Sequence, residues 1–176
     1  MDKKLQKKVV LTGPYEDVVK DGDHLYIVHK LDTVCVIPYT ISVKDILDKV
    51  GVIKKMDILE DKELLTPITG YVSKDDGTNL VTANRLLFET IGSNVKTAED
   101  WMYLGTITNI SGGRMVLYCA NITDVAVNES PEIKENKEAL KFDMVAANQI
   151  VSSDDALFLA AYMRLFNYFY VNSLKS

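Results

Sequence analysis

The feature that most constrains the fold is an apolar helix near the C-terminus. The segment Ala156–Val171 reads ALFLAAYMRLFNYFYV, and its only strongly polar residues are Arg164 and Asn167. A helix that is apolar nearly all the way round has to bury more than one face. It is therefore either fully internal or covered on its second face by another chain, and the sequence leaves both alternatives open.

Six aromatic side chains on this helix exceed what one stripe against a sheet requires. Aromatic surface that can lose its water is typical of interface centres. Burial of one such side chain contributes about 1.5–3 kcal/mol, so an exposed second face would favour association. The sequence thus predicts a homodimer or a protein partner bound through the C-terminal helix. The predicted interface residues are Phe158, Tyr162, Phe166, Phe169 and Tyr170.

Composition and charge narrow the class of protein. The chain has 176 residues, 47% hydrophobic and 26% charged, which is typical of one globular domain. A net charge of −5 argues against general nucleic-acid binding, although the N-terminus carries a local lysine cluster. No run approaches the length of a membrane-spanning helix, and no signal-peptide pattern opens the chain. We therefore expect a cytoplasmic protein, or one in the host cytoplasm if the gene is viral.

The order of the expected elements predicts the fold class. Short β-rich runs extend from residue 24 to residue 68, and an amphipathic helix follows, with Asp76 or Thr78 as its N-cap and Gly92 just past its end. A hairpin, an acidic loop, a short strand and the C-terminal helix complete the chain. This order predicts an α/β (α+β) fold with a mixed β-sheet sandwiched between helices. We expect a single domain at residues 21–176. The basic segment 1–20 either precedes this domain or forms part of it.

Residues 65–92 read LTPITGYVSKDDGTNLVTANRLLFETIG, with Gly70, Arg85 and Gly92 at spacings that resemble a Nudix box. The family pattern is a glycine, five residues, a glutamate, seven residues, and then Arg-Glu-apolar-x-Glu-Glu-x-Gly. Gly70 matches the opening glycine, Arg85 the arginine and Gly92 the closing glycine. The flanking segments are similar in order to the ADP-ribose pyrophosphatase branch of the Nudix superfamily, over about residues 30–170. The resemblance implies a Nudix-like fold for that part of the chain.

The box departs from the family pattern at the positions that carry the chemistry. In the family, carboxylates spaced three and four residues apart share a helix face and hold a divalent metal on a diphosphate. The three corresponding positions here are Leu86, Glu89 and Thr90. The earlier glutamate position falls at Gly77, or at Asp76 if one residue is inserted. The resemblance therefore implies a degenerate Nudix box, and we expect no bound metal; Glu89 and Asp76 would be the ligands if one bound.

A ligand could still bind in the cleft between the box and the following hairpin. Trp101, Tyr103 and Arg114 are natural contacts to a nucleotide base or phosphate, and a core or rim position is the alternative for all three. For Arg85 the alternative to a role in a site is a surface ion pair with Glu89, one helical turn away. The candidate binding residues are Gly70, Arg85, Glu89, Trp101 and Arg114.

Two functions of different classes follow from the sequence. The leading one is a catalytically impaired Nudix-fold protein that acts as a binding or assembly module, with a nucleotide as candidate ligand and no cofactor. The alternative is a divergent metal-dependent hydrolase of nucleoside diphosphate derivatives such as ADP-ribose. In that case Glu89 would be catalytic and the cofactor magnesium or manganese. Asp75, Asp76 or acidic residues of the 128–138 loop would then have to rebuild the metal site.

Overall fold

The computed structural model describes residues 8–13, 16–21, 24–29, 32–44, 46–57, 61–108, 113–128 and 140–173. Within these ranges it contains a three-stranded sheet, a seven-stranded mixed sheet and the helices α1 (Asn79–Ile91) and α3 (Ala156–Ser173). Two short 3-10 helices, η1 (Ala98–Asp100) and η2 (Ala147–Ser152), precede strand β8 (Trp101–Thr108) and helix α3, respectively. No helix in the described ranges is long and apolar enough to span a membrane.

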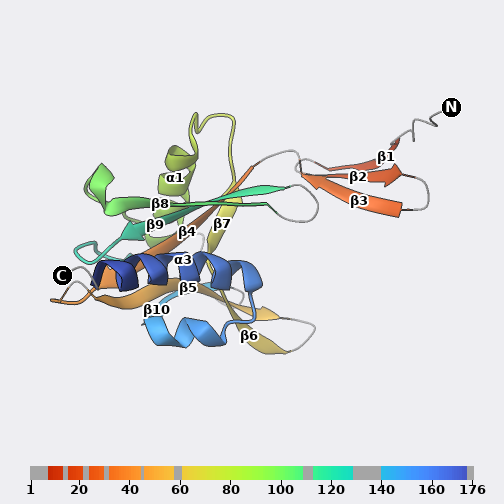
Figure 1. The fold of residues 1–176 in the computed structure, drawn as a ribbon. Coiled ribbons are helices and arrows are strands. Elements are labelled where there is room, and N and C mark those ends of the chain that lie inside the picture. Colours follow the sequence, from red (N-terminus) through yellow and green to blue (C-terminus); the bar gives the residue numbers. More distant parts are fainter. Residues whose placement is uncertain are drawn as a thin grey trace.

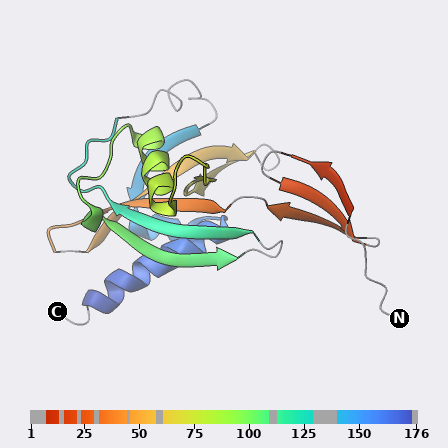
Figure 2. The same cartoon turned by 90° about the horizontal axis from the view of Figure 1, so that it is seen from above.

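The N-terminal strands form a separate antiparallel meander of β1 (Lys8–Thr12), β2 (Glu16–Asp21) and β3 (His24–His29). It projects from the main body of the molecule in both ribbon views (Figure 1, Figure 2). The boundary expected between residues 20 and 21 falls inside β2, and the division of the chain into a basic segment and a domain stays a prediction. The meander carries seven exposed apolar side chains: Val9, Val10, Leu11, Leu25, Tyr26, Ile27 and Val28.

The main sheet is built around β4, which pairs in parallel with β9 and antiparallel with β5 and β7. The path through the sheet runs β10-β5-β4-β9-β8, with β6 paired to β5. Residues 34–39 in β4 read VCVIPY and are all buried, as expected for a strand covered on both faces. The strands are β4 (Thr33–Ile41), β5 (Leu47–Asp57), β6 (Lys62–Thr66), β7 (Ile68–Tyr71), β8 (Trp101–Thr108), β9 (Arg114–Asn121) and β10 (Leu140–Ala146).

The two helices lie on opposite faces of this sheet (Figure 1). Alternate residues of β4 point to opposite faces, so Val34 and Val36 pack with α1 while Cys35 and Ile37 pack with α3. Each face therefore has its own apolar cluster, and the sheet lies between two helices. The predicted fold class, a mixed sheet sandwiched between helices, is confirmed.

Helix α3 buries only part of its aromatic surface. Phe158 and Tyr162, which we expected at an interface, lie in the core with at most 2% of their surface exposed, because this side of the helix packs on the sheet. Phe169 is half-buried against Tyr39, with ring centroids 5.4 Å apart. The remaining predicted interface residues, Phe166 and Tyr170, are exposed and stack on each other along the helix.

Candidate functional site

The loop between β7 and α1 folds around the carboxylate of Asp76. The Asp76 side chain is buried and accepts hydrogen bonds from the Ser73 amide at 2.9 Å and from the Thr82 hydroxyl at 2.8 Å. Gly77 adopts a φ of 70°, a left-handed conformation that favours glycine, and Thr78 then caps the helix by accepting from the Val81 amide at 3.2 Å. The loop therefore holds a carboxylate inward, beside the first turns of α1.

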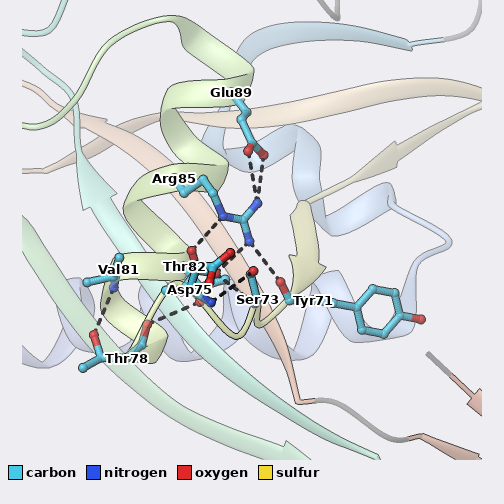
Figure 3. Close-up of polar contacts among 9 residues, drawn as sticks. Tyr71, Ser73, Asp75, Thr78, Val81, Thr82, Arg85 and Glu89 are labelled. Carbon is cyan, nitrogen blue, oxygen red and sulfur yellow. Dashed lines mark hydrogen bonds and ion pairs between the residues drawn. The ribbon is translucent and has the colours of Figure 1, made fainter. Parts of the chain in front are cut away.

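Arg85 joins this loop to the helix (Figure 3). Its Nε donates to Asp76 Oδ1 at 3.0 Å, and its Nη2 donates to Asp76 Oδ2 at 2.9 Å. Nη1 donates to both carboxylate oxygens of Glu89 at 3.1 and 3.2 Å, and Nη2 also reaches the Tyr71 carbonyl at 3.1 Å. One guanidinium thus bridges two carboxylates and the end of β7; we call this set the Arg85 network.

The charges in the Arg85 network stabilise one another. The hydrogen bonds from Arg85 hold the pKa of Asp76 well below its ordinary value, and the bonds from Ser73 and Thr82 act in the same direction, against the effect of burial. The hydrogen bonds to Asp76, and next those to Glu89, raise the pKa of Arg85 further above its ordinary value. Asp76 and Arg85 are therefore charged at neutral pH, in a mutually satisfied ion pair.

The other two positions of the box face inward and carry no charge. Leu86 is 7% exposed and lies directly over Gly70, where an added methyl group would come within 2.4 Å of Leu86 Cδ2. The hydroxyl of Thr90 is buried and donates to the backbone carbonyl of Leu86 at 2.8 Å. Glu89 is therefore the single carboxylate among positions 86, 89 and 90, and Arg85 binds both of its oxygens.

This donor set does not fit a hard divalent cation, which prefers several anionic oxygens converging on one point. The two predicted metal ligands, Glu89 and Asp76, both lie against the cationic guanidinium of Arg85. In the part of the chain that the structure describes, no three His, Cys, Asp or Glu side chains gather where they could hold a metal ion. The acidic residues between 129 and 138, which the sequence offered as replacement ligands, lie outside the described residues.

The predicted binding residues fall into two groups. Gly70 lies on β7 under Leu86 of α1, the helix that also carries the Arg85–Glu89 ion pair, whereas Trp101 and Arg114 lie on the β8–β9 hairpin. Trp101 is half-buried and meets Tyr118 edge-on, with ring centroids 6.2 Å apart. Arg114 is more exposed; its Nε donates to Asp32 Oδ2 at 3.0 Å, its Nη2 contacts the same oxygen, and this pairing raises the pKa of Arg114.

A hollow of about 280 Å³ lies beside Arg114 on the hairpin. The sequence pointed to two of its lining residues, Tyr103 and Arg114, as candidate ligand contacts. It missed the other four, because an isolated asparagine, threonine, valine or tyrosine in a strand or at a helix start carries no motif. Sequence reasoning also missed Asp76 as the main partner of Arg85. The available signal was that five residues separate Gly70 from Asp76, as the family pattern requires for its first carboxylate. The residues that line the hollow are Asn79, Tyr103, Thr106, Arg114, Val116 and Tyr118.

Comparison with known proteins bears on the fold. No protein-family model and no curated protein matches the chain significantly. Among solved structures, the chain is similar to the crystal structure of an ADP compounds hydrolase, with a TM-score of 0.64 and 13% sequence identity, over 96% of this chain and 94% of that chain. A likeness at this level of identity establishes common architecture and leaves activity open. The chain therefore has a Nudix-like fold.

Proposed function

We propose that this protein is a Nudix-fold binding module with a degenerate Nudix box and not an efficient hydrolase. The observation that carries the proposal is the Arg85 network, in which one guanidinium occupies the oxygens of both Asp76 and Glu89. These carboxylates serve as structural ion-pair partners that fix the β7–α1 loop. Arg85 thereby offsets part of the negative charge that would attract a metal ion to them.

The chemistry of diphosphate cleavage supports this proposal. A metal ion that neutralises the developing charge needs several anionic ligands on one helix face. Leu86 and Thr90 supply none, and removal of one group that stabilises a transition state typically costs about 3–4 kcal/mol. Recruitment of Glu89 would break two charge-assisted hydrogen bonds to Arg85. Both requirements act against metal-assisted hydrolysis at this helix.

Hydrolysis and metal uptake are measured on the purified chain. We expect no cleavage of ADP-ribose, dinucleotides or nucleoside triphosphates above background in millimolar magnesium or manganese, and no metal uptake by calorimetry. Glu89→Gln should behave like the unmodified protein in both assays. Glu99→Gln, which changes an exposed carboxylate in η1, is the matched control. Cleavage that Glu89→Gln abolishes and Glu99→Gln preserves would refute the proposal.

The alternative function, a divergent hydrolase of nucleoside diphosphate derivatives, draws support from the structural likeness to an ADP compounds hydrolase. It requires that acids from residues 129–138 complete a metal site around Glu89. The same assays decide between the two functions, because the hydrolase has to take up magnesium or manganese before it can cleave. Metal uptake that survives in Glu99→Gln and is lost in Glu89→Gln would favour the hydrolase.

We further propose that the exposed side of α3 associates with a second copy of this chain. Met163, Phe166 and Tyr170 are about half exposed, lie one turn apart in succession and carry no charge, so that two copies can meet through the same patch without opposing like charges. Sedimentation velocity tests this self-association. We expect a dimer for the unmodified chain and a monomer for the double variant Phe166→Ser, Tyr170→Ser, with Asn167→Ser as control. A monomeric unmodified chain, or a double variant that remains dimeric, would contradict the proposal.

A further inference from the structure

We propose that one face of the N-terminal meander binds the surface of a bilayer that contains anionic phospholipids. The inference goes beyond the binding role proposed above and does not depend on it. Both ribbon views show the meander projecting from the main body of the molecule, so that a large, flat partner can reach it (Figure 1, Figure 2). The strand register decides which side chains would meet that partner.

The pairing of the three strands divides the meander into two faces. Residues directly opposite each other on adjacent strands share a face, and successive residues along a strand alternate between faces. Two neighbouring rows on one face bring lysine and aliphatic side chains together, and Glu16 pairs with His29 in the row beyond them. We call these two rows the lysine face; they are Lys8, Lys20 and Leu25, followed by Leu11, Val18 and Ile27.

The aliphatic side chains of the lysine face are open to solvent. Leu11 is 66% exposed, Leu25 64% and Ile27 48%. Burial of apolar surface is favourable in proportion to its area, so these side chains gain when another surface covers them. An apolar patch of this kind, with charged side chains beside it, is typical of a site that meets a protein or a membrane.

The two lysines of this face form a like-charge pair. Lys8 and Lys20 are both exposed and lie directly opposite each other on adjacent strands, and no described carboxylate side chain forms an ion pair with either. Like charges in this position destabilise a sheet. An anionic surface would offset the repulsion, and the sequence places three more lysines, Lys3, Lys4 and Lys7, directly before β1. Clusters of lysine are what anionic lipid surfaces attract.

An anionic bilayer fits this face better than another macromolecule does. A two-fold contact with a second copy would bring the lysine pairs of both copies into one contact area. The centres of protein interfaces are depleted in lysine and enriched in aromatic residues and arginine, and the two rows contain neither of the latter. Nucleic acid offers negative charge but no apolar layer. A bilayer offers acyl chains to the aliphatic side chains and phosphate groups to the lysines, whose ammonium groups stay hydrated.

Co-sedimentation with phospholipid vesicles measures the binding of the full chain. The anionic probe is a vesicle of phosphatidylcholine with phosphatidylserine, and the neutral probe is a vesicle of phosphatidylcholine alone. We expect the chain to bind the anionic vesicles, to dissociate as the salt concentration is raised, and to bind the neutral vesicles at least about tenfold more weakly. One lysine at an anionic surface contributes about fivefold, so the double variant Lys8→Gln, Lys20→Gln should bind about thirtyfold more weakly.

Matched variants separate the lysine face from general effects of charge and folding. The double variant Lys74→Gln, Lys96→Gln removes the same charge from exposed loops of the main body and should bind as the unmodified chain does. Leu25→Thr should weaken binding about tenfold. Tyr26→Thr changes the next residue of the same strand, on the opposite face, and should leave binding unchanged. Both threonine variants keep a residue that favours strands, and loss of the lysine pair should leave Tm unchanged or raise it.

Four results would overturn the proposal. The chain does not bind anionic vesicles, it binds neutral vesicles equally well, the two lysine double variants bind alike, or Tyr26→Thr weakens binding as much as Leu25→Thr. If Leu25→Thr instead dissociates a dimer in sedimentation velocity and leaves vesicle binding unchanged, the lysine face belongs to a second copy and the proposal is wrong. These outcomes are independent of the hydrolysis and metal assays of the Nudix box, so the two proposals fail separately.

Discussion

Replacement of Asp76 by asparagine tests whether the Arg85 network fixes the β7–α1 loop. The carboxylate accepts two hydrogen bonds from Arg85, one from the Ser73 amide and one from the Thr82 hydroxyl. Asparagine keeps one of the two oxygens and turns an NH2 group toward these donors. We expect Asp76→Asn to lower the free energy of unfolding by about 2–4 kcal/mol at neutral pH. For a chain of this size that corresponds to a fall in Tm of about 4–16 °C.

The sign of the pH dependence follows from the lowered pKa of Asp76. Since the folded pKa lies below the ordinary value of 3.8, the ionised carboxylate stabilises the folded chain. This contribution is complete above the pKa of the unfolded state and is lost as the pH falls toward the folded pKa. The stability difference between the unmodified chain and Asp76→Asn should therefore be constant from about pH 5 to 8 and narrow below about pH 4.

Urea denaturation followed by circular dichroism, repeated across this pH range, measures the difference. Asp75→Asn is the control, because Asp75 is the exposed neighbouring carboxylate; its effect should stay within about 0.5 kcal/mol. Equal stability of the two variants at neutral pH would refute the structural role of Asp76. A difference that persists unchanged at pH 3 would refute the assignment of that role to its charge.

Three further substitutions test packing and backbone geometry. Gly70→Ala should lower the free energy of unfolding by about 1–3 kcal/mol, because the new methyl group comes within 2.4 Å of Leu86 Cδ2. In a Leu86→Ala background the same substitution should cost less, and simple additivity of the two substitutions would contradict the contact. Gly92→Ala should lower the urea midpoint through its φ of 66° and a clash with the Asn128 carbonyl, and an unchanged midpoint would disprove both. Tyr162→Phe should lower the free energy of unfolding by about 1–2 kcal/mol in thermal melts, because the Tyr162 hydroxyl donates to a carbonyl of η2 at 2.7 Å. An unchanged stability would mean that water replaces this hydroxyl.

The features that sequence predicted are those fixed by local rules. Gly92 was the candidate helix end and holds that place, and Thr78, one of two candidate N-caps with Asp76, caps α1. The pair of Arg85 and Glu89 follows from a spacing of four residues on a helix. The order of strands and helices predicted a sheet between helices, because apolar strands need cover on both faces.

The features that sequence missed depend on tertiary geometry. Asp76 reaches Arg85 across nine positions through a loop whose shape depends on the left-handed conformation of Gly77, and counting back along the chain left this position ambiguous. Tyr103 and Thr106 share a face only because of a bulge, which simple alternation along a strand does not predict. An apolar helix likewise does not reveal which side packs inward, so Phe158 was assigned to an interface although it belongs to the core.

The arginines of the chain connect these observations. The chain contains three, and each is engaged within the molecule: Arg85 by Asp76 and Glu89, Arg114 by Asp32, and Arg164 by carbonyls of the β8 bulge. Recognition of a diphosphate draws on guanidinium groups whose charge is uncompensated, because each phosphate oxygen has to be paired as it loses water. Here the guanidinium groups instead fix a loop, a strand end and a bulge. All three guanidinium groups are thus engaged within the fold, which acts against recognition of a diphosphate by arginine.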